Sequence, residues 1–147
     1  MGQFVETHRG MVQAWECDHL GHMNVQFYIA RCSDAAWHLM HHVGLSPSFA
    51  RAERIGLAAV RYDTEFRREL RAGDLLRMDT AVLAIGRSSI RLLNRLWNAG
   101  TGEIAMLMRN DGVCLDLETR RARPLPDFVR TRAEALLVTE EEARACP

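Results

Sequence analysis

The chain has 147 residues, of which 48% are hydrophobic and 26% are charged, a composition typical of one globular domain. Its 19 basic residues are balanced by 19 acidic ones. This balance excludes the strongly basic surface that nucleic acid or an anionic membrane requires, so we expect neither as a partner. We predict a single domain over residues 1–147, with residues 130–147 forming a peripheral helix or tail.

Several site classes are not supported by the residue spacing. The cysteines form no C-x-x-C pair and no zinc-finger spacing, and His38 and His42 lack the glutamate of an H-E-x-x-H pattern, so no metal is predicted. There is no hydrophobic leader and no apolar run of about 18 residues. We therefore expect a cytoplasmic protein with reduced thiols. The cysteines are Cys17, Cys32, Cys114 and Cys146.

A strand and then a long helix are expected in the first third of the chain. Apolar residues alternate loosely from Phe4, and this strand is expected to break at residues 18–21. From Asn24 apolar residues recur at spacings of three, four and seven, which predicts a helix of about 20 residues. Asn24 is the expected N-cap, Gly44 the expected C-terminal cap, and Pro47 discourages continuation of the helix.

The rest of the chain has a period of two. Residues 57–70 alternate apolar and charged side chains, and the turn at residues 72–74 predicts a hairpin to the next strand. Residues 110–112 indicate either a bulge within a long strand or a tight turn between two short ones. The charged residues 131–145 predict a short exposed helix or a frayed tail. The other predicted strands occupy residues 75–86, 88–98 and 103–117.

This order of elements predicts an α+β fold in which one curved antiparallel sheet wraps around one long central helix. The helix covers only one face of such a sheet, whereas the strand at residues 91–97 carries apolar residues on both sides. The second face or an edge is therefore expected to meet another subunit. We predict a homo-oligomer.

The stretch directly before the expected helix crowds Asp18, His22 and Asn24 around Gly21. An aspartate there is often only a turn or cap residue. However, Gly21 permits a close backbone approach, and the unpaired amides of a helix start are natural donors to an oxyanion. A carboxylate beside such donors is suited to acyl transfer, in which Asp18 attacks a carbonyl carbon or takes a proton from water.

The neighbouring polar residues each allow two interpretations. His22 is either a structural donor or a catalytic group, and Asn24 is either a cap or a site residue. Asp34 falls in mid-helix, where it either faces water or has a role that compensates for its poor helix propensity. Ser88 and Ser89 follow Gly86 at a strand start, where turn chemistry alone explains them.

These features together resemble the hotdog-fold acyl-CoA thioesterases of the 4-hydroxybenzoyl-CoA thioesterase type, over residues 4–128. The resemblance implies hydrolysis of an acyl-CoA thioester, with no cofactor beyond the CoA of the substrate. It also implies a homodimer or tetramer with the active site at the subunit interface. The matching segments are Asp18-x-x-Gly21-His22-x-Asn24, Phe27-Tyr28, "RAGDLLRMDTAVLAIGRSS" and "ETRRARPLP".

By this resemblance Asp18 is the nucleophile or general base, and the helix-start amide that polarises the thioester carbonyl lies near Val25. Glu16 stands where relatives often carry aspartate, and Val25 where many carry asparagine. The implied substrate-binding residues are Gly21, Tyr28, Arg67, Arg87, Ser88 and Ser89, with Arg68 and Arg91 as further candidates for the CoA phosphates.

Two alternatives stay open. An acyl-carrier-protein thioesterase would use His22, Asn24 and Asp34, which occupy positions comparable to those of a second branch of the fold. A binding module would hold an acyl-CoA without cleaving it. Neither the acyl group nor the choice between dimer and tetramer follows from the residues.

Overall fold

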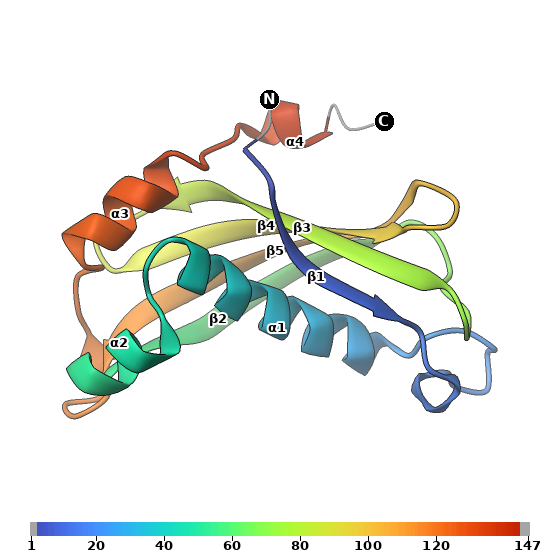
Figure 1. The fold of residues 1–147 in the computed structure, drawn as a ribbon, viewed down its shortest axis with the longest axis horizontal. Helices are drawn as coiled ribbons and strands as arrows, with labels where there is room; N and C mark the ends of the chain where they lie inside the picture. The colour runs from blue at the N-terminus through green and yellow to red at the C-terminus, as the bar shows by residue number, and fades with distance from the viewer. Residues whose placement is uncertain (1–2, 145–147) are drawn as a thin grey trace.

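A long helix, α1 (Val25–His42), lies along the concave face of a curved antiparallel sheet in the computed structural model, which describes residues 3–144 (Figure 1). The strand order is β1-β3-β4-β5-β2, and β6 pairs with β5. The α+β prediction of one curved sheet around one long helix is therefore confirmed. The strands are β1 (Val5–Met11), β2 (Ile55–Phe66), β3 (Leu75–Ile85), β4 (Ser89–Asn98), β5 (Glu103–Asp116) and β6 (Arg121–Ala122).

Helix α1 begins and ends where its sequence predicts. The side chain of Asn24 accepts a hydrogen bond from the Gln26 amide at 3.1 Å, which satisfies one of the unpaired donors at the helix start. At the other end Gly44 has φ +101, a left-handed conformation that suits glycine. The face turned to the sheet carries Tyr28, Cys32, Ala35 and Leu39, all buried. This stripe fixes the helix on the sheet.

The segments on either side of α1 differ from the prediction. The first strand ends at Met11, and a 3-10 helix, η1 (Ala14–Glu16), follows it, so the strand does not continue to residue 18. Pro47 lies beyond the end of α1 and is the first residue of a second helix, α2 (Pro47–Glu53). Proline is favoured at this position because the first amide of a helix has no partner to lose.

The predicted hairpin between β2 and β3 is wrong. β2 pairs with β5 at one edge of the sheet, whereas β3 pairs with β1 and β4 near the other edge. Residues 67–74 cross between the two, held by hydrogen bonds from the Arg67 amide to the Ala105 carbonyl and from the Met23 amide to the Leu70 carbonyl. A run with period two identifies strands, but it does not say which strands pair.

Residues 110–112 form neither the predicted bulge nor the predicted turn, since they run regularly within β5. The irregularity lies opposite them in β2, between Ala59 and Arg61. The charged C-terminal stretch is also more ordered than a frayed tail. It contains α3 (Asp127–Glu134) and α4 (Glu140–Arg144), and Val138 between them donates a backbone hydrogen bond to the Val82 carbonyl.

A row of buried polar side chains crosses the concave face of the sheet, one from each of four adjacent strands. Thr7 and Thr80 join their hydroxyls at 2.8 Å, Thr80 donates to Asn94 at 2.8 Å, and Asn94 donates to Asn110 at 2.8 Å. This polar row divides the core. The near core, on the side where α1 begins, includes Tyr28, Met23, Met78, Leu96, Met106 and Met108. The far core includes Leu39, Val43, Val82, Ile90, Leu92 and Val129.

In residues 3–144 no helix is long and apolar enough to cross a membrane. Within the same residues, no three His, Cys, Asp or Glu side chains are grouped to bind a metal ion. Cys17, Cys32 and Cys114 are free thiols, and Cys146 lies outside the described residues. The cytoplasmic location stays a prediction.

Candidate active site

Residues 17–23 form a hairpin-like turn directly before α1, referred to below as the Asp18 turn. Cys17 and Met23 pair as an isolated antiparallel bridge, and the Asp18 amide donates to the His22 carbonyl at 3.2 Å. The Gly21 amide donates to the Asp18 carbonyl at 3.0 Å, and φ of +84 at Gly21 closes the turn. Other residues rarely adopt this φ, so glycine is required by the backbone here.

The Asp18 carboxylate is held by two donors. Its Oδ1 accepts from the Leu20 amide at 2.9 Å, and its Oδ2 accepts from Nδ2 of Asn24 at 2.9 Å. These bonds, with Asn24 the larger cause and the Leu20 amide the second, lower the pKa of Asp18 below its ordinary value. The side chain is therefore an oriented, ionised carboxylate at neutral pH.

Asn24 caps the helix and also contacts Asp18, so its predicted role as a cap is confirmed and its role as a site residue stays a prediction. Its Oδ1 caps α1 while its Nδ2 holds Asp18. Its own amide donates to the Glu16 carbonyl at 2.9 Å. The amide of Val25 follows at the first position of α1, where an N–H has no partner within the helix.

A cavity of about 490 Å³ opens at this end of the molecule. Its volume lies in the range of small-molecule binding sites. The rings of Tyr28 and Phe66 meet edge to face in its wall, with centroids 5.0 Å apart. Burial, with a contribution from Glu69, raises the pKa of Tyr28 to about 12, so this phenol stays protonated. The lining residues are Asp18, Leu20, His22, Met23, Asn24, Val25, Tyr28, Phe66, Arg67, Arg68 and Glu69.

His22 lies in the cavity wall but does not make a hydrogen bond to Asp18 among the described residues. Its Nδ1 lies 3.4 Å from the Met23 carbonyl, and its Nε2 lies 3.9 Å from a Glu69 oxygen. Asp34 is not brought to the same site, because it lines a separate hollow on the exposed side of α1 with Trp37 and His38. A site built on His22 and Asp34 is therefore not assembled within one chain.

The predicted substrate-binding residues separate into two groups. Gly21 closes the Asp18 turn, and Tyr28 and Arg67 line the cavity. In contrast, Arg87 and Ser88 lie in the β3–β4 turn and Ser89 begins β4, next to Ile90 of the far core.

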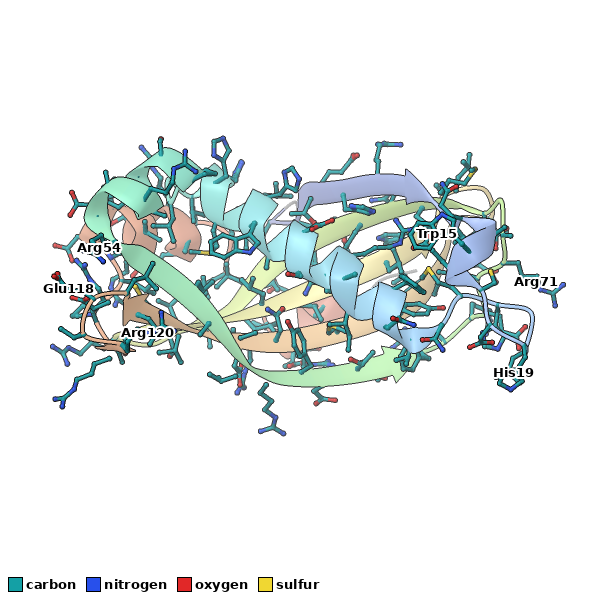
Figure 2. All side chains as sticks on the ribbon, turned by 90° about the horizontal axis from the view of Figure 1, so that it is seen from below. Trp15, His19, Arg54, Arg71, Glu118 and Arg120 are labelled. Atoms are coloured by element: carbon teal, nitrogen blue, oxygen red, sulfur yellow. The ribbon has the colours of Figure 1, made fainter. Side chains whose placement is uncertain are left out.

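The backbone of Arg87 and Ser88 holds the β3–β4 turn against β5 and the C-terminal segment. The Arg87 carbonyl accepts a hydrogen bond from the Leu125 amide at 3.0 Å, and the Ser88 carbonyl accepts one from the Cys114 amide at 2.7 Å. Figure 2 shows the two ends of the molecule, with His19 and Arg71 at the end where α1 begins and Arg54, Glu118 and Arg120 at the other.

Phe66 and Glu69 are among the cavity residues that sequence reasoning missed. Phe66 is the last apolar residue of the alternation in β2, so its position at the strand end was an available signal. Glu69 lies in the connection between β2 and β3, beyond the end of the strand, so the alternation does not place its side chain. Arg91, a further candidate for phosphate binding, instead pairs with Asp111 at 2.6 Å, and the same cluster includes Arg109 and lies outside the cavity.

The curved antiparallel sheet around one long central helix is the hotdog fold. The chain belongs to the thioesterase-like superfamily, whose family model matches residues 12–133. The resemblance stated from the sequence is thereby confirmed.

The chain is 27% identical over 147 residues to a protein described as betainyl-CoA thioesterase from Pseudomonas aeruginosa, an alignment that covers 100% of this chain and 91% of the relative. Among solved structures, a Staphylococcus aureus protein in complex with CoA superimposes with a TM-score of 0.83 at 20% identity, covering 90% of this chain and 84% of the other. A 1,4-dihydroxy-2-naphthoyl-CoA thioesterase from Synechocystis gives a TM-score of 0.76 at 17% identity, covering 88% and 95%. These two structures show that the fold is shared.

Proposed function

We propose that the protein hydrolyses an acyl-CoA thioester to a carboxylic acid and free CoA, with Asp18 as the catalytic carboxylate. The observation that carries this proposal is the ionised Asp18, held by Asn24 beside the first amides of α1 in the wall of the cavity. Family membership supports the thioesterase class. The CoA bound to one structural neighbour and the CoA ester named for the relative support the carrier.

In the proposed reaction the thioester carbonyl oxygen lies against the Val25 amide. The partial positive charge of the helix start stabilises the negative charge that develops on this oxygen. An Asp18 oxygen bonds to the carbonyl carbon, the carbon–sulfur bond breaks, and the CoA thiolate leaves and takes a proton from solvent. Water then hydrolyses the mixed anhydride, which releases the acid and restores the carboxylate.

A general-base route gives the same products, because Asp18 then takes a proton from the water that attacks the carbonyl carbon. A single turnover in H₂¹⁸O separates the two routes. Label in the Asp18 carboxylate identifies direct attack followed by opening of the anhydride at the Asp18 carbon, because the general-base route places label only in the product acid.

The cavity wall supports a division of the substrate into two parts. Val25, Tyr28 and Phe66 offer apolar and aromatic surface for the acyl group. Arg67 and Arg68 at the same cavity are suited to the phosphates of CoA, because guanidinium groups bind phosphate oxygens while remaining partly solvated. The aromatic rings and the Glu69 carboxylate also suit a cationic acyl group such as the betainyl group of the relative.

A second copy is proposed to complete the site. β2 is an edge strand with exposed Val60, Tyr62 and Phe66, and Val25 and Ile29 of α1 are exposed as well. Antiparallel pairing of β2 with the same strand of another copy would cover this surface and satisfy the edge.

Because the two strands run in opposite directions, the far end of one copy then lies beside the cavity of the other. This arrangement would bring Arg87, Ser88 and Ser89 of the partner subunit towards the CoA.

The test is thiol release from acyl-CoAs with short, medium, long, aryl and betainyl groups, for the wild type and for Asp18→Asn. We expect hydrolysis of at least one ester and a fall in kcat of about 10²-fold to 10⁴-fold in the variant. Asp34→Asn is the matched comparison, because this acid lies outside the cavity.

Loss of activity in Asp34→Asn but not in Asp18→Asn would favour the alternative site with His22. Binding of acyl-CoA without thiol release would favour a binding module, and release only from an acyl carrier protein would identify the other carrier.

A further inference from the structure

A buried ion pair joins the start of the Asp18 turn to the second turn of α1. Nη2 of Arg31 lies 2.6 Å from Oε1 of Glu16, and the two side chains are only 11% and 6% exposed. This pair is not among the residues that line the cavity, so it has no direct contact with a substrate there. Its role therefore depends on the segments that it holds in place.

Both ends of the Asp18 turn depend on Glu16. Its carboxylate accepts from the Gln13 amide at 2.8 Å in addition to Arg31, which fixes the chain before the turn. Its backbone carbonyl accepts from the Asn24 amide at 2.9 Å, which fixes the chain after the turn. Asn24 in turn donates to Asp18 and caps α1. A displacement of Glu16 is therefore transmitted to the Asp18 carboxylate.

Arg31 anchors this arrangement to the helix and to β1. Its Nη2 also donates to the Met11 carbonyl at 3.1 Å, and its Nη1 lies 2.9 Å from Nε2 of His8. Burial and the nearby Arg31 charge lower the pKa of His8, so this imidazole is neutral and accepts from Arg31. The guanidinium thereby ties Glu16 to two elements that have fixed positions on the sheet.

A buried ion pair of this kind is a weak source of net stability, because desolvation of the two charges offsets their attraction. It does fix geometry, and the rate of an acyl transfer depends on geometry at the scale of about 1 Å. We propose that Glu16 and Arg31 are positioning residues that hold Asn24, and through it the Asp18 carboxylate, in line with the first amides of α1. This inference rests on the proposed function.

The kinetic test uses Glu16→Ala, Arg31→Met and the conservative Glu16→Gln. The first two are expected to lower kcat by about 10-fold to 100-fold with KM changed by less than about twofold, because only the reacting group moves. Glu16→Gln keeps an oxygen that accepts from Gln13 and Arg31, so it is expected to retain most of the activity. In an Asp18→Asn background the same changes should have little further effect, since they act through Asp18.

A loss of folding is controlled in two ways. The double variant Glu16→Gln with Arg31→Met leaves no unpaired buried charge, so it is expected to fold although it lacks the ion pair between the turn and α1. Asp79→Ala removes a partner from the Asp79–Arg95 pair, which is equally buried, with side chains 8% and 11% exposed, but lies on the other face of the sheet. It is expected to lower the Tm and to leave kcat unchanged.

The proposal is overturned if Asp18→Asn abolishes hydrolysis while Glu16→Ala and Arg31→Met keep the wild-type kcat, or if their effects multiply with that of Asp18→Asn. A wild type that releases no thiol would count against the proposed function instead. Amide hydrogen exchange then decides the inference, because loss of the pair should accelerate exchange at residues 24–27 and unchanged protection there would contradict it.

Discussion

The two ends of the molecule share one sheet and one helix, yet they differ in how completely they are filled. The near core is rich in methionine and borders a cavity with ionisable groups in its wall. The far core contains mostly branched aliphatic side chains, and α2 and α3 close it. The polar row lies between them. Under the proposed function, reactivity and stability are concentrated in opposite halves of one domain.

The polarity of α1 explains why the open half is the one where the helix begins. Unpaired amides at a helix start attract negative charge, whereas unpaired carbonyls at a helix end repel it. At its C-terminal end α1 closes tightly: the Leu45 amide donates to the Met40 carbonyl at 2.8 Å, and the Val43 amide to the Leu39 carbonyl at 3.0 Å. Only the beginning of the helix is suited to an oxyanion.

The largest expected effect that tests this comparison of the two halves is a loss of stability from a substitution in the far core. Leu92 is fully buried there, and Leu92→Ala should lower the free energy of unfolding by about 2–5 kcal/mol because it leaves a cavity. Urea denaturation measures this change. The kcat of the folded variant should stay within about twofold of the wild type. A fall in kcat as large as that of Asp18→Asn would break the proposed separation.

A smaller effect, on turnover rather than stability, is expected from Asn24→Ala in the near half. Loss of the bond to Asp18 should lower kcat by about 10-fold to 100-fold, and loss of the cap should cost about 1 kcal/mol of stability. The pH profile of kcat/KM gives a second readout. Asp18 acts when ionised, so wild-type activity should persist below the ordinary pKa of 3.8 and fall as the pH drops through the lowered value.

The hydrogen bond from Asn24 is the larger cause of the lowered pKa of Asp18. In Asn24→Ala this pKa should therefore rise, and the acid limb of the kcat/KM profile should move to higher pH. Asn98→Ala is a suitable control. The Asn98 side chain also accepts hydrogen bonds from backbone amides, those of Gly100 and Thr101, but it lies at the β4–β5 turn and not at the cavity. An acid limb that does not move in Asn24→Ala would show that Asp18 is not the titrating group.

The smallest effect is expected from Arg87→Ala, which would raise KM for acyl-CoA by about twofold to fivefold, since an exposed charge contributes about 1 kcal/mol or less to binding. Mixed dimers test whether Arg87 acts across the interface. A dimer of one Asp18→Asn chain and one Arg87→Ala chain then contains one intact site, with the wild-type KM. If Arg87 served its own chain, every active site in the mixture would show the raised KM.

What could be predicted from the sequence depended on the distance over which residues interact. Helix α1 and its cap at Asn24 follow from neighbours within a few positions, and both were predicted correctly. The pairing of β2 with β5 joins residues about 50 positions apart, and local periodicity does not contain it. The approach of Phe66 to Tyr28 and the tie between Glu16 and Arg31 are likewise visible only after folding.

The family resemblance placed Asp18 at the helix start, and the structure puts it in a cavity with Asn24 and Val25. Asp34 was harder to assign, because an aspartate in mid-helix gives no indication of the side it occupies until the helix is set on the sheet. Arg87, Ser88 and Ser89 remain a prediction for the same kind of reason, since their approach to a cavity requires a second chain.

The polar row also determines the alignment of the strands. If β4 slid by two residues against β3, Asn94 would lie opposite Met78 or Val82 and its amide would lose its partner in an apolar setting. Only one register satisfies all the members of the row at once, so mispaired sheets are disfavoured. The row also separates the two clusters, so a substitution beside the cavity is expected to leave the packing of the opposite half unchanged.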